Sequence, residues 1–300
     1  KLKTTYVDIL PTLTNRKTGR VHTTFSQTSA ATGRLSSMNP NLQNIPAGSG
    51  FGREVRKAFI AAPEFQLVSF DYSQIELRVA AHLADDAGMI DAFKKGEDIH
   101  KTTAAAVYHI LPEHVTSEQR RAAKTLNFGV LYGMGPRAFA AATGLSRAEA
   151  EQFIEQYFQK FAGILIYLAH TKAFALEHGY VETLYGRRRA IPEIASANWQ
   201  IRREAERMAI NHPIQGSATG DIIKRAMIRI DKEITDHKLN RYVRMLLQVH
   251  DELIFEIAKD AFQKVIPRIR DAMEHIVTLK VPLVVDVKVG QNWGEQYTFL

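Results

Sequence analysis

Cysteine is absent from the chain, and so are long apolar runs, internal repeats and low-complexity tracts. Without cysteine the protein forms no disulfide and no thiolate zinc site, which fits a reducing compartment. Without an apolar run of membrane-spanning length we expect no transmembrane helix and no membrane partner, and the first residues do not resemble a signal peptide. These absences argue against a disulfide-stabilised scaffold and against an integral membrane protein.

The composition is that of a globular protein with a basic balance. Hydrophobic types make up 45% of the 300 residues, which is enough for a sizeable core and for more than one domain. Lysine and arginine total 39 against 32 acidic residues, giving a net charge of +7. This balance favours an anionic partner such as nucleic acid. Because the chain opens abruptly in a charged segment, we expect it to be a fragment of a longer protein.

The order of strand and helix patterns predicts the fold class. Residues 1–60 mix short apolar pieces with turn formers and are typical of hairpins and loops. A strand pattern over 65–70 ends at Asp71, and helical periodicity dominates 98–175. Two further strand patterns surround residues 250–252, which we expect to form a three-residue hairpin connection. A sheet with helices inserted mid-sequence predicts an α+β fold rather than a doubly wound α/β fold.

The segment RRAAKTLNFGVLYG, residues 120–133, carries the strongest local signal. Arg120, Lys124, Phe128 and Tyr132 recur every four residues, so on a helix they line one slowly drifting face. Core-facing stripes rarely contain two cations in register, whereas a polyanionic ligand with a flat end suits cations followed by rings. This order predicts a nucleoside triphosphate site. The alternative is a solvated basic turn followed by core aromatics.

Two acidic positions are candidates for binding a metal ion. Asp71 follows a strand, and Asp251 lies at the predicted hairpin tip with Glu252 beside it. Hard ions such as Mg²⁺ are held by one or two carboxylates plus substrate phosphates, and paired ions support in-line phosphoryl transfer. The alternative is that these acids are simply good turn residues.

Polar side chains elsewhere are weaker candidates for contacts with nucleic acid. Arg34 and Gln43 lie in loop-like segments, and Arg207, Asn211 and Gln215 repeat every four residues on a predicted helix. Such side chains suit hydrogen bonds to phosphates, sugars or base edges. Hydrogen-bonded loop groups and a solvated helix face are the alternatives.

Three long segments together resemble the motifs of family A DNA polymerases of the bacterial type. These are DYSQIELR at 71–78, the helix at 120–133, which fits R-x-x-x-K-x-x-x-F-G-x-x-Y-G, and QVHDE at 248–252. Further matches are TGRLSS at 32–37, NLQNIP at 41–46 and the helix over 203–221. The resemblance covers essentially the whole chain with its motifs in the expected order.

The resemblance implies a set of site residues. The implied ligands of two Mg²⁺ ions, which Mn²⁺ can replace, are Asp71, the Tyr72 carbonyl and Asp251, and Glu252 is a supporting carboxylate. With Lys124 these carboxylates form the catalytic set. The implied nucleotide-binding residues are Gln74, Glu76, His100, Arg120, Lys124, Phe128 and Tyr132. The implied DNA-binding residues are Arg34, Gln43, Arg207, Asn211, Gln215 and His250.

Some implied roles are more specific. Lys124 is placed to protonate the leaving pyrophosphate, because lysine is a better acid than arginine. Glu76 would exclude a 2′-hydroxyl, which makes the substrate a deoxynucleotide. Phe128 would discriminate against dideoxynucleotides, and Tyr132 would stack near the templating base.

The resemblance also implies an organisation and a biological setting. Residues 1–78 and 193–300 would form a palm with an antiparallel sheet, and residues 79–192 would form mainly helical fingers. The thumb and exonuclease regions of the family would be missing from this chain. We expect a DNA-directed DNA polymerase that acts as a monomer on primer–template DNA and dNTPs. It would serve repair and replication at the nucleoid, in the bacterial cytoplasm.

Three other function classes stay open at the level of sequence. A non-catalytic nucleic-acid-binding protein would not need Asp71 and Asp251. A metal-dependent nuclease uses paired carboxylates but needs no triphosphate clamp such as Arg120 and Lys124. A polymerase of ribonucleotides is disfavoured by Glu76.

Overall fold

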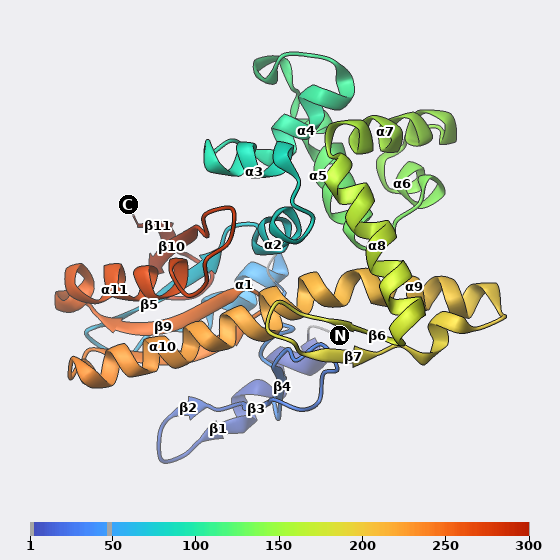
Figure 1. Cartoon of the computed structure of the whole chain (residues 1–300). Coiled ribbons are helices and arrows are strands. Elements are labelled where there is room, and N and C mark those ends of the chain that lie inside the picture. Colours follow the sequence, from blue (N-terminus) through green and yellow to red (C-terminus); the bar gives the residue numbers. More distant parts are fainter. Residues whose placement is uncertain (1–2, 47–49, 300) are drawn as a thin grey trace. The chain divides into compact units, whose positions relative to one another are not determined.

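The computed structural model describes residues 3–46 and 50–299, and the chain divides into two compact units (Figure 1). Unit 1 comprises Lys1–Ser73, Thr219–Val277 and Val284–Leu300. Unit 2 comprises Gln74–Ala218 and Thr278–Leu283. The protein is α+β, as the order of patterns predicted, since one unit is built on an antiparallel sheet and the other is mainly helical.

A five-stranded sheet in the order β11-β10-β5-β9-β8 organises unit 1, and every neighbouring pair is antiparallel. The strands are β5 (Phe65–Tyr72), β8 (Val243–Val249), β9 (Glu252–Ala258), β10 (Val285–Gly290) and β11 (Tyr297–Thr298). The interior strand β9, between β5 and β8, is almost continuously buried. Such a strand needs apolar side chains on both of its faces, which explains why its sequence does not alternate.

Two helices cover one face of this sheet, α10 (Ile223–Asp236) and α11 (Phe262–Glu274) (Figure 1). Phe70 and Phe255 meet edge to face on this side, with ring centroids 5.4 Å apart. The Tyr72 hydroxyl donates to the carbonyl oxygen of Met273 in α11 at 2.9 Å. Because side chains alternate along a strand, residues 68, 70 and 72 point to the helices while residues 67, 69 and 71 point away from them.

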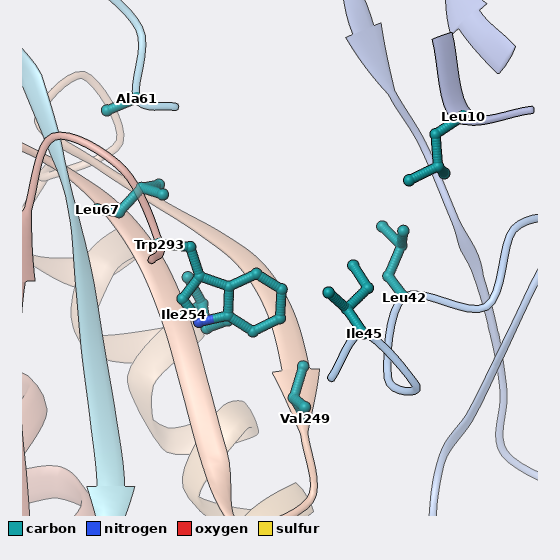
Figure 2. Packing of buried hydrophobic residues seen from close by; sticks show 8 residues of the cluster. All are labelled: Leu10, Leu42, Ile45, Ala61, Leu67, Val249, Ile254 and Trp293. Atoms are coloured by element: carbon teal, nitrogen blue, oxygen red, sulfur yellow. The ribbon is translucent and has the colours of Figure 1, made fainter. Parts of the chain in front are cut away.

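The opposite face packs against a second apolar cluster, shown in Figure 2. Its buried members are Leu10, Leu42, Ile45, Ala61, Leu67, Val249, Ile254 and Trp293. Leu10 begins the short helix η2 (Leu10–Leu13), and Tyr6 of η1 (Lys3–Val7) and Val55 of α1 (Phe51–Lys57) pack against the cluster as partly buried residues. As the turn-rich sequence predicted, this region also holds two small hairpins, β1 (Thr14–Asn15) with β2 (Arg20–Val21) and β3 (Thr24–Ser26) with β4 (Ser36–Met38).

Helices make up most of unit 2. They are α2 (Ile75–Leu83), α3 (Ala87–Lys94), α4 (Ile99–Tyr108), α5 (Ser117–Leu131), α6 (Pro136–Thr143), α7 (Arg147–Lys160), α8 (Ala162–His178) and α9 (Trp199–Gln215). Shorter elements are η3 (Pro112–His114), η4 (Pro192–Ala195) and a hairpin of β6 (Tyr180–Glu182) and β7 (Arg188–Ala190). A π-helical turn, η5 (Gly216–Ile222), connects α9 to α10. Within the described part of the chain, no helix combines the length and apolarity needed to cross a membrane.

Candidate active site

Three carboxylates lie side by side at the end of the sheet in unit 1. Asp71 in β5 pairs with Glu252 in β9 on one side and with Asp286 in β10 on the other. Directly opposed residues in an antiparallel pair project from the same face. These side chains therefore share the face that points away from α10 and α11, and this proximity arises from pairing between distant parts of the sequence.

Asp251 lies in the turn that joins β8 to β9. Val249 pairs with Glu252, so the turn consists of His250 and Asp251 alone, and the predicted three-residue connection was one residue too long. His250 has φ 55°, a left-handed conformation that a non-glycine residue rarely adopts. The Tyr72 N–H donates to the Asp251 carbonyl at 3.2 Å, which ties the turn to the end of β5.

The electrostatics of this carboxylate pair favour a cation. Burial, together with the negative charges of Asp251 and Glu252, raises the pKa of Asp71 to about 7. Burial also raises the pKa of Asp251, and the Asp71 carboxyl is close enough to act as its hydrogen-bond partner. Asp71 Oδ1 is buried and has no hydrogen-bond partner among the residues that the structure describes. Because like-charged buried carboxylates are unfavourable without a counter-charge, these residues fit a divalent metal ion.

Within residues 3–46 and 50–299, no group of three or more histidine, aspartate or glutamate side chains is arranged as a ready metal-binding cluster. An ion at Asp71 and Asp251 would consequently need further oxygen ligands, such as the Tyr72 carbonyl, water or substrate phosphates. Mg²⁺ is commonly bound in this manner, with one or two carboxylates and a substrate.

Three of the predicted DNA-binding residues lie beside the carboxylates in unit 1, namely Arg34, Gln43 and, in the same turn as Asp251, His250. Arg34 donates from Nε to the Thr219 hydroxyl, and its positive charge acts on Asp251. Gln43 holds Gln248 in place, since its Nε2 donates to Gln248 Oε1 at 2.8 Å and to the Gln248 carbonyl at 3.2 Å. Gln248 in turn donates from Nε2 to the His250 carbonyl at 2.6 Å. The loop that contains Gln43 thus supports the turn that contains Asp251.

The predicted cation-and-ring stripe of unit 2 lies on α5 and on its C-cap residue. Thr116 caps this helix in a reciprocal capping box with Gln119. Arg120 and Lys124 are exposed, and Phe128 and Tyr132 are partly exposed. The stripe faces outward, whereas the helix buries another face, which includes Ala123, Leu126, Asn127 and Val130.

Contacts with α4 organise the first half of this stripe. Arg120 Nε donates to Asp98 Oδ2 at 2.6 Å, while Asp98 Oδ1 caps α4 by accepting from the His100 and Lys101 N–H groups. Burial opposes ionisation of Asp98, but the Arg120 hydrogen bond and the backbone donors prevail and lower its pKa. His100 is buried and its ring centroid lies 5.8 Å from that of Phe128. Three of the predicted nucleotide-binding residues therefore form one neighbourhood.

The C-terminal end of α5 meets α2 and α9. The Tyr132 hydroxyl donates to Glu76 Oε2, which brings together two predicted nucleotide-binding residues. Gln74 adopts the left-handed conformation immediately before α2. Arg207 in α9 packs over Gly133 so closely that a Cβ atom there would lie 2.7 Å from Arg207 Cγ. Gly133 also has φ 70°, so both its space and its conformation require glycine.

The other two predicted residues of α9 lie towards its C-terminal end. Asn211 has a buried Oδ1 atom that finds no hydrogen-bond partner in the described part of the chain. Gln215 is the last residue of the helix and is partly exposed. A buried amide oxygen without a partner is unfavourable unless a ligand or a water molecule satisfies it.

Comparison with known proteins agrees with these motifs. The sequence profile described as "DNA polymerase family A" matches residues 1–295. The chain belongs to DNA polymerase family A. It is 49% identical to DNA polymerase I of Pseudomonas aeruginosa over 99% of this chain and 32% of that protein. It is 53% identical to DNA polymerase I of Deinococcus radiodurans over 98% of this chain and 30% of that protein.

The fold of this family A chain matches a solved polymerase domain. The POL domain of Pol1 from M. smegmatis, in complex with DNA primer-template and dNTP, superposes with a TM-score of 0.91. That structure is 45% identical in sequence, and the match covers 96% of this chain and 50% of the other. The chain spans about a third of the length of the curated relatives it matches.

Several residues of the candidate site have no role predicted from the sequence, although Gln248 and Asn127 lie inside two of its motifs. Strand register or helix packing places Asp286, Gln248 and Asn127. The local sequence gives little indication of the contacts that these residues make. Asp98 carries a detectable signal, since an aspartate before a helix is a strong N-cap candidate. Its ion pair with Arg120 joins positions 22 residues apart and needs the tertiary fold.

Proposed function

We propose that this chain catalyses template-directed addition of deoxynucleotides to the 3′ end of a DNA primer, with release of pyrophosphate. The observation that carries the proposal is the partly buried pair Asp71 and Asp251, in which Asp71 has a raised pKa and an oxygen without a hydrogen-bond partner among the described residues. In a member of DNA polymerase family A, such a pair is suited to binding the ions that phosphoryl transfer requires.

The carboxylates of unit 1 would hold two Mg²⁺ ions, with Mn²⁺ as a substitute. Asp71, Asp251 and the Tyr72 carbonyl are the proposed ligands, and Glu252 supports them from the first position of β9. When bound, the ions supply Lewis-acid stabilisation of the charge that develops on the phosphate oxygens. The raised pKa of Asp71 supports this role, because a bound cation favours the ionised carboxylate.

The outward stripe of α5 would bind the incoming nucleotide. Arg120, Lys124 and His100 contact the triphosphate, and Lys124 gives a proton to the leaving pyrophosphate. Glu76, held by the Tyr132 hydroxyl, excludes a ribose 2′-hydroxyl. Phe128 packs on the nucleotide, and Gln74 lies beside the pocket.

The proposed contacts with primer and template are Arg34, Gln43, Arg207, Asn211, Gln215 and His250. The unpartnered oxygen of Asn211 supports a polar ligand at that position. We propose that unit 1 is the core of the palm and that unit 2 contains the fingers, with sequence boundaries near 78 and 193. A monomer that acts on bacterial DNA in repair and replication is the corresponding cellular role.

A metal-dependent nuclease is the second candidate, because paired carboxylates also serve hydrolysis. The outward Arg120 and Lys124 favour the polymerase, since a nuclease requires no triphosphate clamp.

Primer extension by the full-length protein with Mg²⁺ and dNTPs tests the proposal. Asp251→Asn should abolish extension while binding of primer–template DNA survives. Asp286→Asn is the matched control, because this exposed carboxylate lies on the same face of the sheet and has no proposed ligand role. Full extension by Asp251→Asn would refute the metal assignment, and hydrolysis without extension by the wild type would favour the nuclease.

A further inference from the structure

His100 and Asn127 form a buried polar pair between α4 and α5. Asn127 Nδ2 lies 2.9 Å from His100 Nδ1, so the amide donates a hydrogen bond to the ring. Asn127 Oδ1 faces the Thr103 hydroxyl at 3.1 Å. Asn127 and Thr103 are fully buried, and His100 is only 2% exposed.

An asparagine is an unexpected residue at the centre of this helix packing. Asparagine is a poor helix former, and its amide is costly to bury without partners. Leucine has a similarly branched side chain and would not carry that cost. The feature that distinguishes Asn127 from an apolar residue is its ability to donate to one nitrogen of His100 while accepting at its oxygen.

The surroundings keep the His100 ring neutral. Burial lowers the pKa of His100 to about 4; the positive charges of Arg120 and Lys124 add to this effect, and Asp98 opposes it. These three side chains are the charged groups that act on the ring from α5 and from the cap of α4. A neutral imidazole donates from one nitrogen only, and the hydrogen bond made by the other nitrogen decides which one.

The second ring nitrogen, Nε2, is not completely enclosed by protein. Within the described residues Nε2 makes no hydrogen bond to protein, yet it is not one of the fully buried polar atoms that lack a partner. The ring also lies beside Phe128, and the positive charges of Arg120 and Lys124 act on it. Nε2 is therefore available to a ligand bound on the cation-and-ring stripe, and donation from it requires the proton to be there.

We propose that Asn127 is a positioning residue that fixes His100 in the Nε2–H tautomer, so that the ring donates to a phosphate oxygen of the incoming nucleotide. The inference rests on the proposed function and extends it. Without Asn127 the neutral ring would populate both tautomers, and the Nδ1–H form would present a lone pair to an anionic ligand.

The test compares nucleotide kinetics of Asn127→Leu, His100→Ala and the double variant in the full-length protein. Asn127→Leu should raise the KM for dNTP about tenfold, the loss expected for one hydrogen bond to a charged group, and change kcat less. The double variant should have the KM of His100→Ala alone, because Asn127 acts through His100. Thr103→Val, which perturbs the same packing but retains the bond to His100, should change KM about twofold or less.

Asn127→Asp gives a readout that a purely structural role would not affect. A carboxylate only accepts, so His100 must carry a proton on Nδ1 and its pKa rises. The KM of this variant should then increase with pH as the imidazolium loses its Nε2 proton, whereas the wild-type KM stays flat near neutral pH. The ¹⁵N chemical shifts of the wild-type His100 ring should report the Nε2–H tautomer.

The outcomes separate this inference from the proposed function. Additive effects in the double variant, an Nδ1–H wild-type tautomer, a pH-independent KM in Asn127→Asp or a large effect of Thr103→Val would each overturn the positioning role. If His100→Ala leaves the KM for dNTP unchanged, the assignment of His100 to the triphosphate is wrong. Absence of primer extension by the wild type would instead count against the polymerase proposal itself.

Discussion

Replacing Asp71 by asparagine should abolish catalysis and at the same time stabilise the metal-free fold. The native carboxylate is close to Asp251 and Glu252, and one of its oxygens is buried with no hydrogen-bond partner within residues 3–46 and 50–299. Asparagine has nearly the same shape but carries no charge, so it relieves the repulsion between like charges. Catalytic function and stability would thus make opposite demands on this position, as is common at strained active sites.

The size of the stabilisation follows from the raised pKa. An increase from 3.8 to about 7 corresponds to about 4 kcal/mol of lost folding free energy at a pH above both values. Asp71 is partly exposed and titrates together with Asp251, so solvent and proton sharing reduce this value. We expect Asp71→Asn to raise the free energy of unfolding by about 2 kcal/mol at pH 8.

The sign of the pH dependence is determined by the same shift. The folded state binds the Asp71 proton more tightly than the unfolded state does. Protonation of Asp71 therefore stabilises the folded protein at low pH. That contribution is lost as the pH rises through about 7. The gain in the free energy of unfolding of Asp71→Asn over the wild type should therefore be complete above pH 7. It should decrease as the pH falls towards 4.

Urea unfolding in EDTA at several pH values measures this difference. Asp286→Asn serves as control and should change the free energy of unfolding by less than about 0.5 kcal/mol, since its side chain is exposed. Added Mg²⁺ should stabilise the wild type, because a ligand that binds only the folded state adds to stability. It should thereby reduce the difference in the free energy of unfolding between the wild type and Asp71→Asn. An Asp71→Asn protein that is no more stable than the wild type in EDTA at pH 8 would refute the reasoning.

Lys124→Ala should lower the rate of the chemical step by about 10²-fold or more and weaken dNTP binding, measured by single-turnover extension; unchanged kinetics would contradict its role as acid. Phe128→Tyr should increase incorporation of dideoxynucleotides relative to dNTPs in a competition assay, and an unchanged ratio would remove that role. Glu256→Gln should lower the free energy of unfolding by about 2 kcal/mol at pH 7, because the fully buried carboxylate forms ion pairs with Arg20 at 3.0 Å and Arg244 at 2.9 Å. Equal unfolding free energies of the variant and the wild type in urea would contradict this.

Local sequence predicted the parts of the site that depend on one helix or one strand. The four-residue spacing from Arg120 to Tyr132 indicated the outward stripe of α5, and the change of pattern near Asp71 indicated a strand followed by a helix. Helical period, capping and β-alternation act over a few residues, so a single segment contains the information. The connection between β8 and β9 was predicted one residue too long, because strand ends depend on pairing with the neighbouring strand.

The sequence by itself determined that this chain is α+β, that it carries the motifs of DNA polymerase family A and that α5 presents cations followed by rings. Only the tertiary structure placed Asp71 between Glu252 and Asp286, joined Arg120 to Asp98, and set Asn127 against His100. These neighbours come from distant segments, and strand register and helix packing depend on the summed contacts of whole elements rather than on any short motif.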